Sequence, residues 1–389
     1  MLTPSRLVLA RKRRGLTLGQ LAAAAQVSVR NVSAYEKGHQ QPNPGVLGRL
    51  GMALQLPVEF LTACDLDEIP VDAISFRALS KLTAGQRDTA RAAGRLALLL
   101  AEWVDARFHL PAPDVPSLPR MDPETAAEVV RARWGLGVAP AGSMVRLLEA
   151  HGVRVFALAA DCATVDSFSF TWQQTPYVLL NTGKTGERGR FDAAHELGHL
   201  ILHSEHRIPH GQDAEQEANR FAAAFLMPRA SVLANNLANA TAERILATKH
   251  TWRVAAMALT YRLHELGLLS DQGYRTACVD LSRRGYRTGE PGGIPRETSQ
   301  LLSKVFRTLR AEGTSPADVA RDLHITTDEL NRHVFGLIPT AIKGGAGTTT
   351  NLLRRPTLTL VTESATADRG EAEMRERTLR VLDSDSARR

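Results

Sequence analysis

The sequence has few cysteines and no long hydrophobic run. Its three cysteines, Cys64, Cys162 and Cys278, are widely spaced. This argues against a disulfide framework and against a cysteine zinc site, and it fits a reducing cytoplasm. No apolar run approaches the roughly 18 residues that span a bilayer, and the N-terminus lacks the hydrophobic stretch of a secretory signal. We therefore expect a cytoplasmic protein with no membrane partner.

Acidic residues are nearly missing from the start of the chain. The whole chain has 48 Lys and Arg against 41 Asp and Glu, a net charge of +7. Residues 1–50 contain one acid, Glu36, so this segment alone accounts for the excess. Its basic residues are Arg6, Arg11, Lys12, Arg13, Arg14, Arg30, Lys37 and Arg49. An asymmetry this local predicts an anionic partner, with nucleic acid favoured over a membrane.

The length and composition allow several folded domains. A chain of 389 residues has room for two or three of them, and 43% hydrophobic residues exclude global disorder. We predict an α+β fold that is predominantly α. It comprises an all-α N-terminal domain at residues 1–65, a domain with a small sheet at 121–285, and a helical region at 286–340.

Residues 1–65 show the pattern of a helix-turn-helix. The expected helices cover residues 5–14, 18–25, 29–37 and about 46–54. Thr17 and Ser28 can cap the second and third helices, because a hydroxyl accepts a free N–H of the first turn. The string Val27-Ser28…Ser33-Ala34-Tyr35-Glu36-Lys37-Gly38…Pro42 resembles the XRE-type helix-turn-helix of phage repressors. Gln26 departs from that family, which usually has Gly in the turn.

The third helix is the expected recognition helix. If it enters the major groove, its early residues face base edges or phosphates. We therefore predict binding to a double-stranded DNA operator, whereas the alternative is a small helical domain with a solvated basic face. The predicted DNA-binding residues are Thr17, Ser28, Arg30, Asn31, Ser33 and Lys37.

Residues 66–120 read as a helical connector followed by a Pro-rich linker. Thr83 and Gln86 have the spacing of a capping box, and an Ala/Leu-rich helix continues from there to about Arg107. The apolar side of this helix serves either as core or as a dimer seam. Repressors of the XRE type commonly act as dimers, so we expect a homodimer.

A five-residue metal motif lies in the middle of the chain. Alternating patterns predict strands at 153–158, 167–172 and 177–181, the last two as a hairpin, followed by a helix that carries His195-Glu196-Leu197-Gly198-His199. Residues i and i+4 lie on one face of a helix, so both imidazoles can reach one ion. Glu196 can reach water on the open side of the metal. The strand near 177–181 is the expected sheet edge for an extended substrate.

A catalytic zinc usually has three protein ligands and an open fourth position. An acid-rich helix follows the motif and offers Asp213, Glu215 and Glu217 as candidates for the third ligand. The residues alone leave this choice open.

Two strings resemble the ImmA/IrrE family of metallopeptidases, over about residues 125–235. They are Phe191-Asp192-Ala193-Ala194-His195-Glu196-Leu197-Gly198-His199-Leu200 and Glu217-Ala218-Asn219-Arg220-Phe221-Ala222-Ala223-Ala224-Phe225-Leu226-Met227-Pro228. The resemblance implies a zincin-like domain that cleaves repressors. It implies His195, His199 and Glu217 as metal ligands and Glu196 as the catalytic base. Zinc is the expected metal, with manganese as the alternative.

The C-terminal region echoes the first domain. An offset of 298 residues places Gly15 on Gly313, Thr17 on Ser315 and Ser28 on Thr326. Residues 313–336 therefore predict a second helix-turn-helix-like unit, and its near-balanced charge argues against DNA contact. Residues 341–389 are expected to be a flexible tail, with a short helix near 371–382.

The sequence as a whole predicts a DNA-binding transcriptional regulator with a zinc endopeptidase domain that cleaves itself or a partner repressor. The alternative is a regulator whose metal domain is a non-catalytic ligand sensor.

Overall fold

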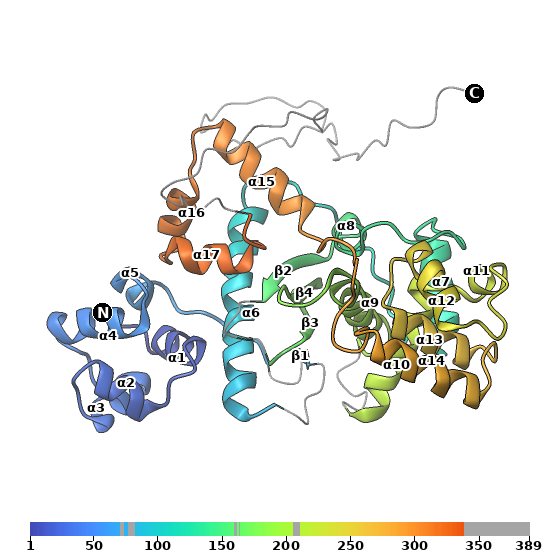
Figure 1. Ribbon diagram of the computed structural model, residues 1–389. Helices are drawn as coiled ribbons and strands as arrows, with labels where there is room; N and C mark the ends of the chain where they lie inside the picture. The colour runs from blue at the N-terminus through green and yellow to red at the C-terminus, as the bar shows by residue number, and fades with distance from the viewer. Residues whose placement is uncertain (71–73, 77–81, 159–161, 163, 205–210, 338–389) are drawn as a thin grey trace, which may run out of the picture.

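The N-terminal residues form short helices, in agreement with the predicted helix-turn-helix (Figure 1). The computed structural model describes residues 1–70, 74–76, 82–158, 162, 164–204 and 211–337. The first helices are α1 (Pro4–Arg13), α2 (Leu18–Ala24), α3 (Val29–Glu36), α4 (Pro44–Leu54) and α5 (Val58–Thr62). Thr17 and Ser28 cap α2 and α3, as expected. Gln26 has φ 53°, so the turn keeps the left-handed backbone that favours glycine. We call residues 1–65 the head.

The long helix α6 (Ala84–Asp105) stands between the head and the sheet (Figure 1). It begins at the predicted capping box, in which the Thr83 hydroxyl accepts from the Gln86 N–H. Gly94 lets the sheet approach closely, because a Cβ there would lie 3.3 Å from the ring of Phe168. Most of its apolar residues are buried within the chain, in agreement with the core alternative.

The sheet has the strand order β1-β3-β4-β2. Its strands are β1 (Ile74–Phe76), β2 (Arg154–Leu158), β3 (Ser167–Trp172) and β4 (Thr175–Asn181). The predicted hairpin of β3 and β4 is confirmed, and β2 lies parallel to β4. The prediction that residues 177–181 form an edge is wrong, because β4 is flanked by β2 and β3. A strand from the connector, β1, pairs with the other side of β3.

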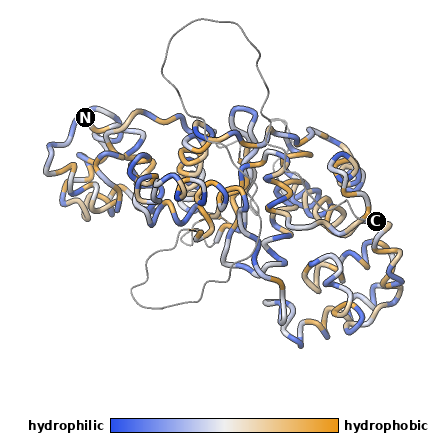
Figure 2. The backbone as a smooth tube through the Cα atoms, turned by 90° about the horizontal axis from the view of Figure 1, so that it is seen from above, coloured by the Kyte–Doolittle hydropathy of each residue, from blue (hydrophilic) through white to orange (hydrophobic). Residues whose placement is uncertain are grey.

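The two faces of the sheet belong to different hydrophobic cores. Phe168 and Leu179 pack with α6 and the head, whereas Val178 and Leu180 pack with the helices on the opposite face. Those helices are α7 (Pro123–Arg133), α8 (Met144–Ala150), α9 (Gly186–Leu202), α10 (Gln212–Leu226), α11 (Arg229–Leu233), α12 (Ala242–Thr248), α13 (Ala256–Glu265) and α14 (Asp271–Arg283). Seen from above, hydrophobic and hydrophilic stretches alternate along most helices (Figure 2). None of the helices in the described ranges is long and apolar enough to cross a membrane.

The predicted second helix-turn-helix-like unit is present in the structure. Its helices are α15 (Gln300–Ala311), α16 (Pro316–Asp322) and α17 (Thr327–His333). Ser315 and Thr326 cap α16 and α17, and His324 has φ 55° at the position equivalent to Gln26. The structural repeat therefore extends to the left-handed turn residue.

The second unit is docked against the head and α6. Glu329 on α17 is fully buried and pairs with Arg13 at 2.6 Å and with Arg14 at 2.9 Å. Trp103 on α6 donates to Asp322 at 3.1 Å. The helix that corresponds to a recognition helix therefore faces the protein. The predicted tail at 341–389 lies outside the described residues.

Glu149 of α8 fastens the start of α15. Its carboxylate accepts hydrogen bonds from the Ser299 hydroxyl and, at 3.0 Å each, from the N–H groups of Gln300 and Leu301. Burial raises the pKa of Glu149 to about 7, although these donors act in the opposite direction. The folded chain therefore holds this proton more tightly than the unfolded chain does.

We expect Glu149→Gln to flatten the pH dependence of stability. Because the folded pKa lies above the unfolded value, the contribution of Glu149 falls as the pH rises from about 4.5 to about 7, by about 3 kcal/mol, and is level above that. Urea unfolding at pH 5 and pH 8 measures the difference for both proteins. An unchanged slope in the variant would show that another group titrates.

Candidate metal centre and nucleic-acid interface

Helix α9 brings His195 and His199 together on one face. Their Nε2 atoms lie 3.0 Å apart. Two nitrogens bound to one tetrahedral zinc at 2.0–2.1 Å would be about 3.3 Å apart. The pair therefore has the separation of two ligands of a single ion, and both rings are buried.

Glu215 completes a cluster with these two histidines. Its carboxylate oxygens lie 3.6 Å from His195 Nε2 and 3.3 Å from His199 Nε2. Among the described residues, this trio has ligand atoms that all lie within 4.8 Å of one another. Two imidazoles and one carboxylate are a donor set that suits zinc.

Helix α10 can supply this carboxylate because it lies close against α9. Gly198, inside the motif, permits the approach: a Cβ there would lie 3.2 Å from Ala218 Cα. Glycine at this position is therefore a packing requirement of the site.

Glu217, the third ligand implied by the sequence resemblance, lies elsewhere. Its carboxylate contacts His203 Nε2 at 2.8 Å, and its side chain is 49% exposed. Residues two apart on a helix are rotated by about 200°, so Glu215 and Glu217 point to nearly opposite sides. The structure thus corrects the expected geometry: Glu215 faces the two histidines and Glu217 does not.

Polar partners orient both histidines of the cluster. Asn219 Oδ1 lies 3.0 Å from His195 Nδ1, and His203 Nδ1 lies 2.9 Å from His199 Nδ1. Such outer contacts fix the ring orientation and the tautomer of metal-binding histidines. Glu217 acts one step further out, through His203. Asn219 was not predicted from the sequence, although it lies four residues after Glu215 and therefore on the same face of α10.

Glu196 is held by strand β3. The hydroxyls of Ser167 and Ser169 donate to its two carboxylate oxygens at 2.6 Å each. All three side chains are buried. These two serines were not predicted from the sequence either, although their alternate positions on β3 place both on the face toward α9.

The predicted DNA-binding residues lie on the outside of the head. Thr17, Ser28, Arg30 and Lys37 are exposed, and Asn31 and Ser33 are partly exposed. Val29, which was not among the predicted DNA-binding residues, is 50% exposed at the start of α3. An apolar side chain there suits contact with a thymine methyl group.

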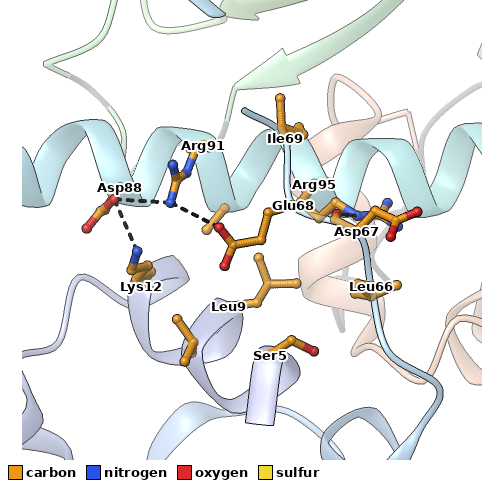
Figure 3. A pocket seen from close by; sticks show the side chains of 12 residues that line it. Ser5, Leu9, Lys12, Leu66, Asp67, Glu68, Ile69, Asp88, Arg91 and Arg95 are labelled. Atoms are coloured by element: carbon orange, nitrogen blue, oxygen red, sulfur yellow. Dashed lines mark hydrogen bonds and ion pairs between the residues drawn. The ribbon is translucent and has the colours of Figure 1, made fainter. Parts of the chain in front are cut away.

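Several basic residues of the head form ion pairs with acids, so the charge excess expected from the sequence is partly neutralised. Arg11 pairs with Glu36, Lys12 with Asp88, and both Arg13 and Arg14 with Glu329. Figure 3 shows Lys12 and Arg91 sharing Asp88 beside a small crevice between α1 and α6. Much of the local excess therefore pairs with acids from later in the chain.

Comparison with known families agrees with these two sites. Residues 7–61 match the family described as helix-turn-helix. Residues 148–264 match a peptidase family, M78, described as IrrE N-terminal-like domain. None of the curated proteins matches the chain. The chain is therefore a fusion of an XRE-type helix-turn-helix domain with a metallopeptidase-like domain of the IrrE N-terminal-like family.

Proposed function

We propose that the chain is a cytoplasmic transcriptional regulator whose metallopeptidase-like domain is a zinc endopeptidase. The observation that carries the proposal is the cluster of His195, His199 and Glu215 with the buried Glu196 beside it on the same helix. A purely structural metal site does not need a carboxylate at the position of Glu196.

The residues of the site have separate roles in this proposal. His195, His199 and Glu215 would hold the ion, which would polarise the scissile carbonyl and acidify a water molecule. Glu196 takes the proton from the attacking water and passes it to the leaving amine. Ser167 and Ser169 keep its carboxylate oriented during this transfer.

The proposed substrate is a protein segment, in a partner repressor or in the chain itself. The proposed assembly on DNA is a homodimer, and light scattering of the full chain measures it. Hydrolysis of a labelled unfolded protein by the zinc-loaded chain and by Glu196→Gln tests the peptidase. Loss of hydrolysis with retained zinc and DNA binding supports it.

A non-catalytic sensor is the second candidate. The observation that favours it is the full burial of Glu196, whose two oxygens already accept from serines. Under this alternative, zinc-loaded wild-type chain hydrolyses nothing, and metal occupancy changes DNA affinity instead.

Arg30→Ala should weaken DNA binding. Arg30 is exposed at the first turn of α3, and loss of a base or phosphate contact costs about 1–3 kcal/mol. We expect an affinity about five- to a hundredfold lower for a mixed-sequence duplex at low salt, and a smaller salt dependence. Arg321→Ala, an exposed change in the second unit, is the control and should bind as wild type. Equal losses in both variants would contradict DNA binding through α3.

A further inference from the structure

Strand β1 pairs with β3, the strand that holds the proposed catalytic glutamate. Ser167 and Ser169, the residues that hold Glu196, are on β3. One side of β3 pairs with β4 and the other with β1, which is antiparallel to it. The register places position 75 of β1 opposite Ser169.

This side of β3 is where an extended substrate would add. Peptides are commonly recognised by joining a sheet edge as a further strand, through main-chain hydrogen bonds. An edge accepts one strand at a time. The connector segment that forms β1 therefore occupies the position that a substrate would take beside Glu196.

Strand β1 is anchored in a hydrophobic core, but it is short. Ile74 is 2% exposed and belongs to the core that α6 and the head share. The strand has three residues, against six in β3 and seven in β4. So short a strand contributes few main-chain hydrogen bonds, and a longer peptide can compete with it.

The strand also lies on the covalent path between the two domains. It follows the head helix α5 and precedes α6. Just before it, Ile69 is buried and the Asp67 carbonyl accepts from Arg95 of α6 at 2.9 Å. Displacement of β1 would therefore loosen the segment that ties the head to α6.

We propose that β1 is a built-in inhibitory strand, which blocks the substrate edge of β3 until it is displaced. The inference rests on the proposed peptidase function, because it assigns the edge to a peptide substrate. Under this proposal, a substrate that displaces β1 also loosens the connector between the DNA-binding head and α6.

Peptide binding in the Glu196→Gln background tests the proposal without turnover. The probe is a fluorescein-labelled peptide that copies residues 71–80, measured by fluorescence anisotropy with zinc present. Ile74→Pro removes the N–H and the side-chain anchor of β1, so it should tighten binding at least tenfold. Leu309→Ala removes a buried side chain from the same core on α15, outside the connector, and it should leave binding unchanged. Equal affinity in the Ile74→Pro and parent chains would overturn the proposal.

Hydrogen exchange of the parent chain is a second test, which does not depend on whether Ile74→Pro folds. An excess of unlabelled peptide should speed exchange in residues 74–76 while β3 stays protected. Bound peptide with unchanged exchange in residues 74–76 would overturn the proposal.

Cleavage measurements distinguish a failure of the peptidase function from a failure of the inhibitory strand. If Ile74→Pro with Glu196 intact binds the peptide tightly but never cleaves it, the peptidase function is wrong and the inhibitory strand stands. If the wild-type chain and the Ile74→Pro variant cleave at the same rate, the inhibitory strand is wrong and the peptidase function stands.

Discussion

Replacing Glu196 with glutamine should lower peptide hydrolysis at least about a hundredfold, because a positioned general base contributes about 10²–10⁴-fold. The amide is nearly isosteric and can still accept from one of the two serines on β3, so the fold and the His195–His199 pair should persist. Zinc content and DNA affinity should therefore equal those of the wild type.

A conservative change elsewhere in the same domain controls for this result. Glu128→Gln alters an exposed carboxylate on α7, and it should hydrolyse at the wild-type rate. Rates are measured on a labelled unfolded protein with one equivalent of zinc. Wild-type hydrolysis in Glu196→Gln would contradict the assignment of the base.

Arg13→Ala should lower the free energy of unfolding by about 3–5 kcal/mol, because it removes a partner from a buried ion pair. The side chains of Arg13 and Glu329 are both 0% exposed, and their charged atoms lie 2.6 Å apart. Burial opposes the ionisation of Glu329, but His333, Arg13 and Arg14 hold the pKa of Glu329 well below its usual range. Without Arg13, the buried carboxylate of Glu329 keeps the contact with Arg14 at 2.9 Å but loses the closer of its two arginine partners.

The pH dependence of this effect has a defined sign. A lowered folded pKa stabilises the chain above the unfolded pKa, and the contribution is lost only as the pH falls through the lowered value. The difference between wild type and Arg13→Ala should thus be constant from pH 6 to pH 8. Arg332→Ala, which removes a 38% exposed partner 3.5 Å from the same carboxylate, is the control and should cost less than about 1 kcal/mol. Urea unfolding measures both, and equal small losses would mean that the head is not held by Arg13.

Local patterns in the sequence predicted much of the fold. The capping box at Thr83, the hairpin that ends at Asn181 and the face shared by His195 and His199 all depend on residues within a few positions of one another. The repeat at offset 298 was also predicted, because caps and turns recur at fixed spacing. Each of these features is set by helix or strand geometry.

The sequence did not predict contacts between segments that lie far apart along the chain. The acids of α10 include Glu215 and Glu217, and the choice depends on how α10 is rotated against α9. The edge prediction for 177–181 failed because β2 pairs in parallel with the side of β4 that faces away from β3. The pairing of β1 with β3 was not predicted either, because β1 comes from a connector about a hundred residues earlier. The excess charge of the head pairs partly with Glu329, more than 300 positions along the chain.

Zinc binding by two matched variants tests the central claim most directly. Titration of the metal-free full chain should give one tight zinc site in the wild type. Glu217→Gln removes only a contact outside the ligand set, so its zinc affinity should be at most about a hundredfold lower. Glu215→Gln should lose a direct ligand and bind more weakly still. If Glu215→Gln binds zinc as the wild type does and Glu217→Gln does not, the proposed assignment of Glu215 as the third ligand is wrong.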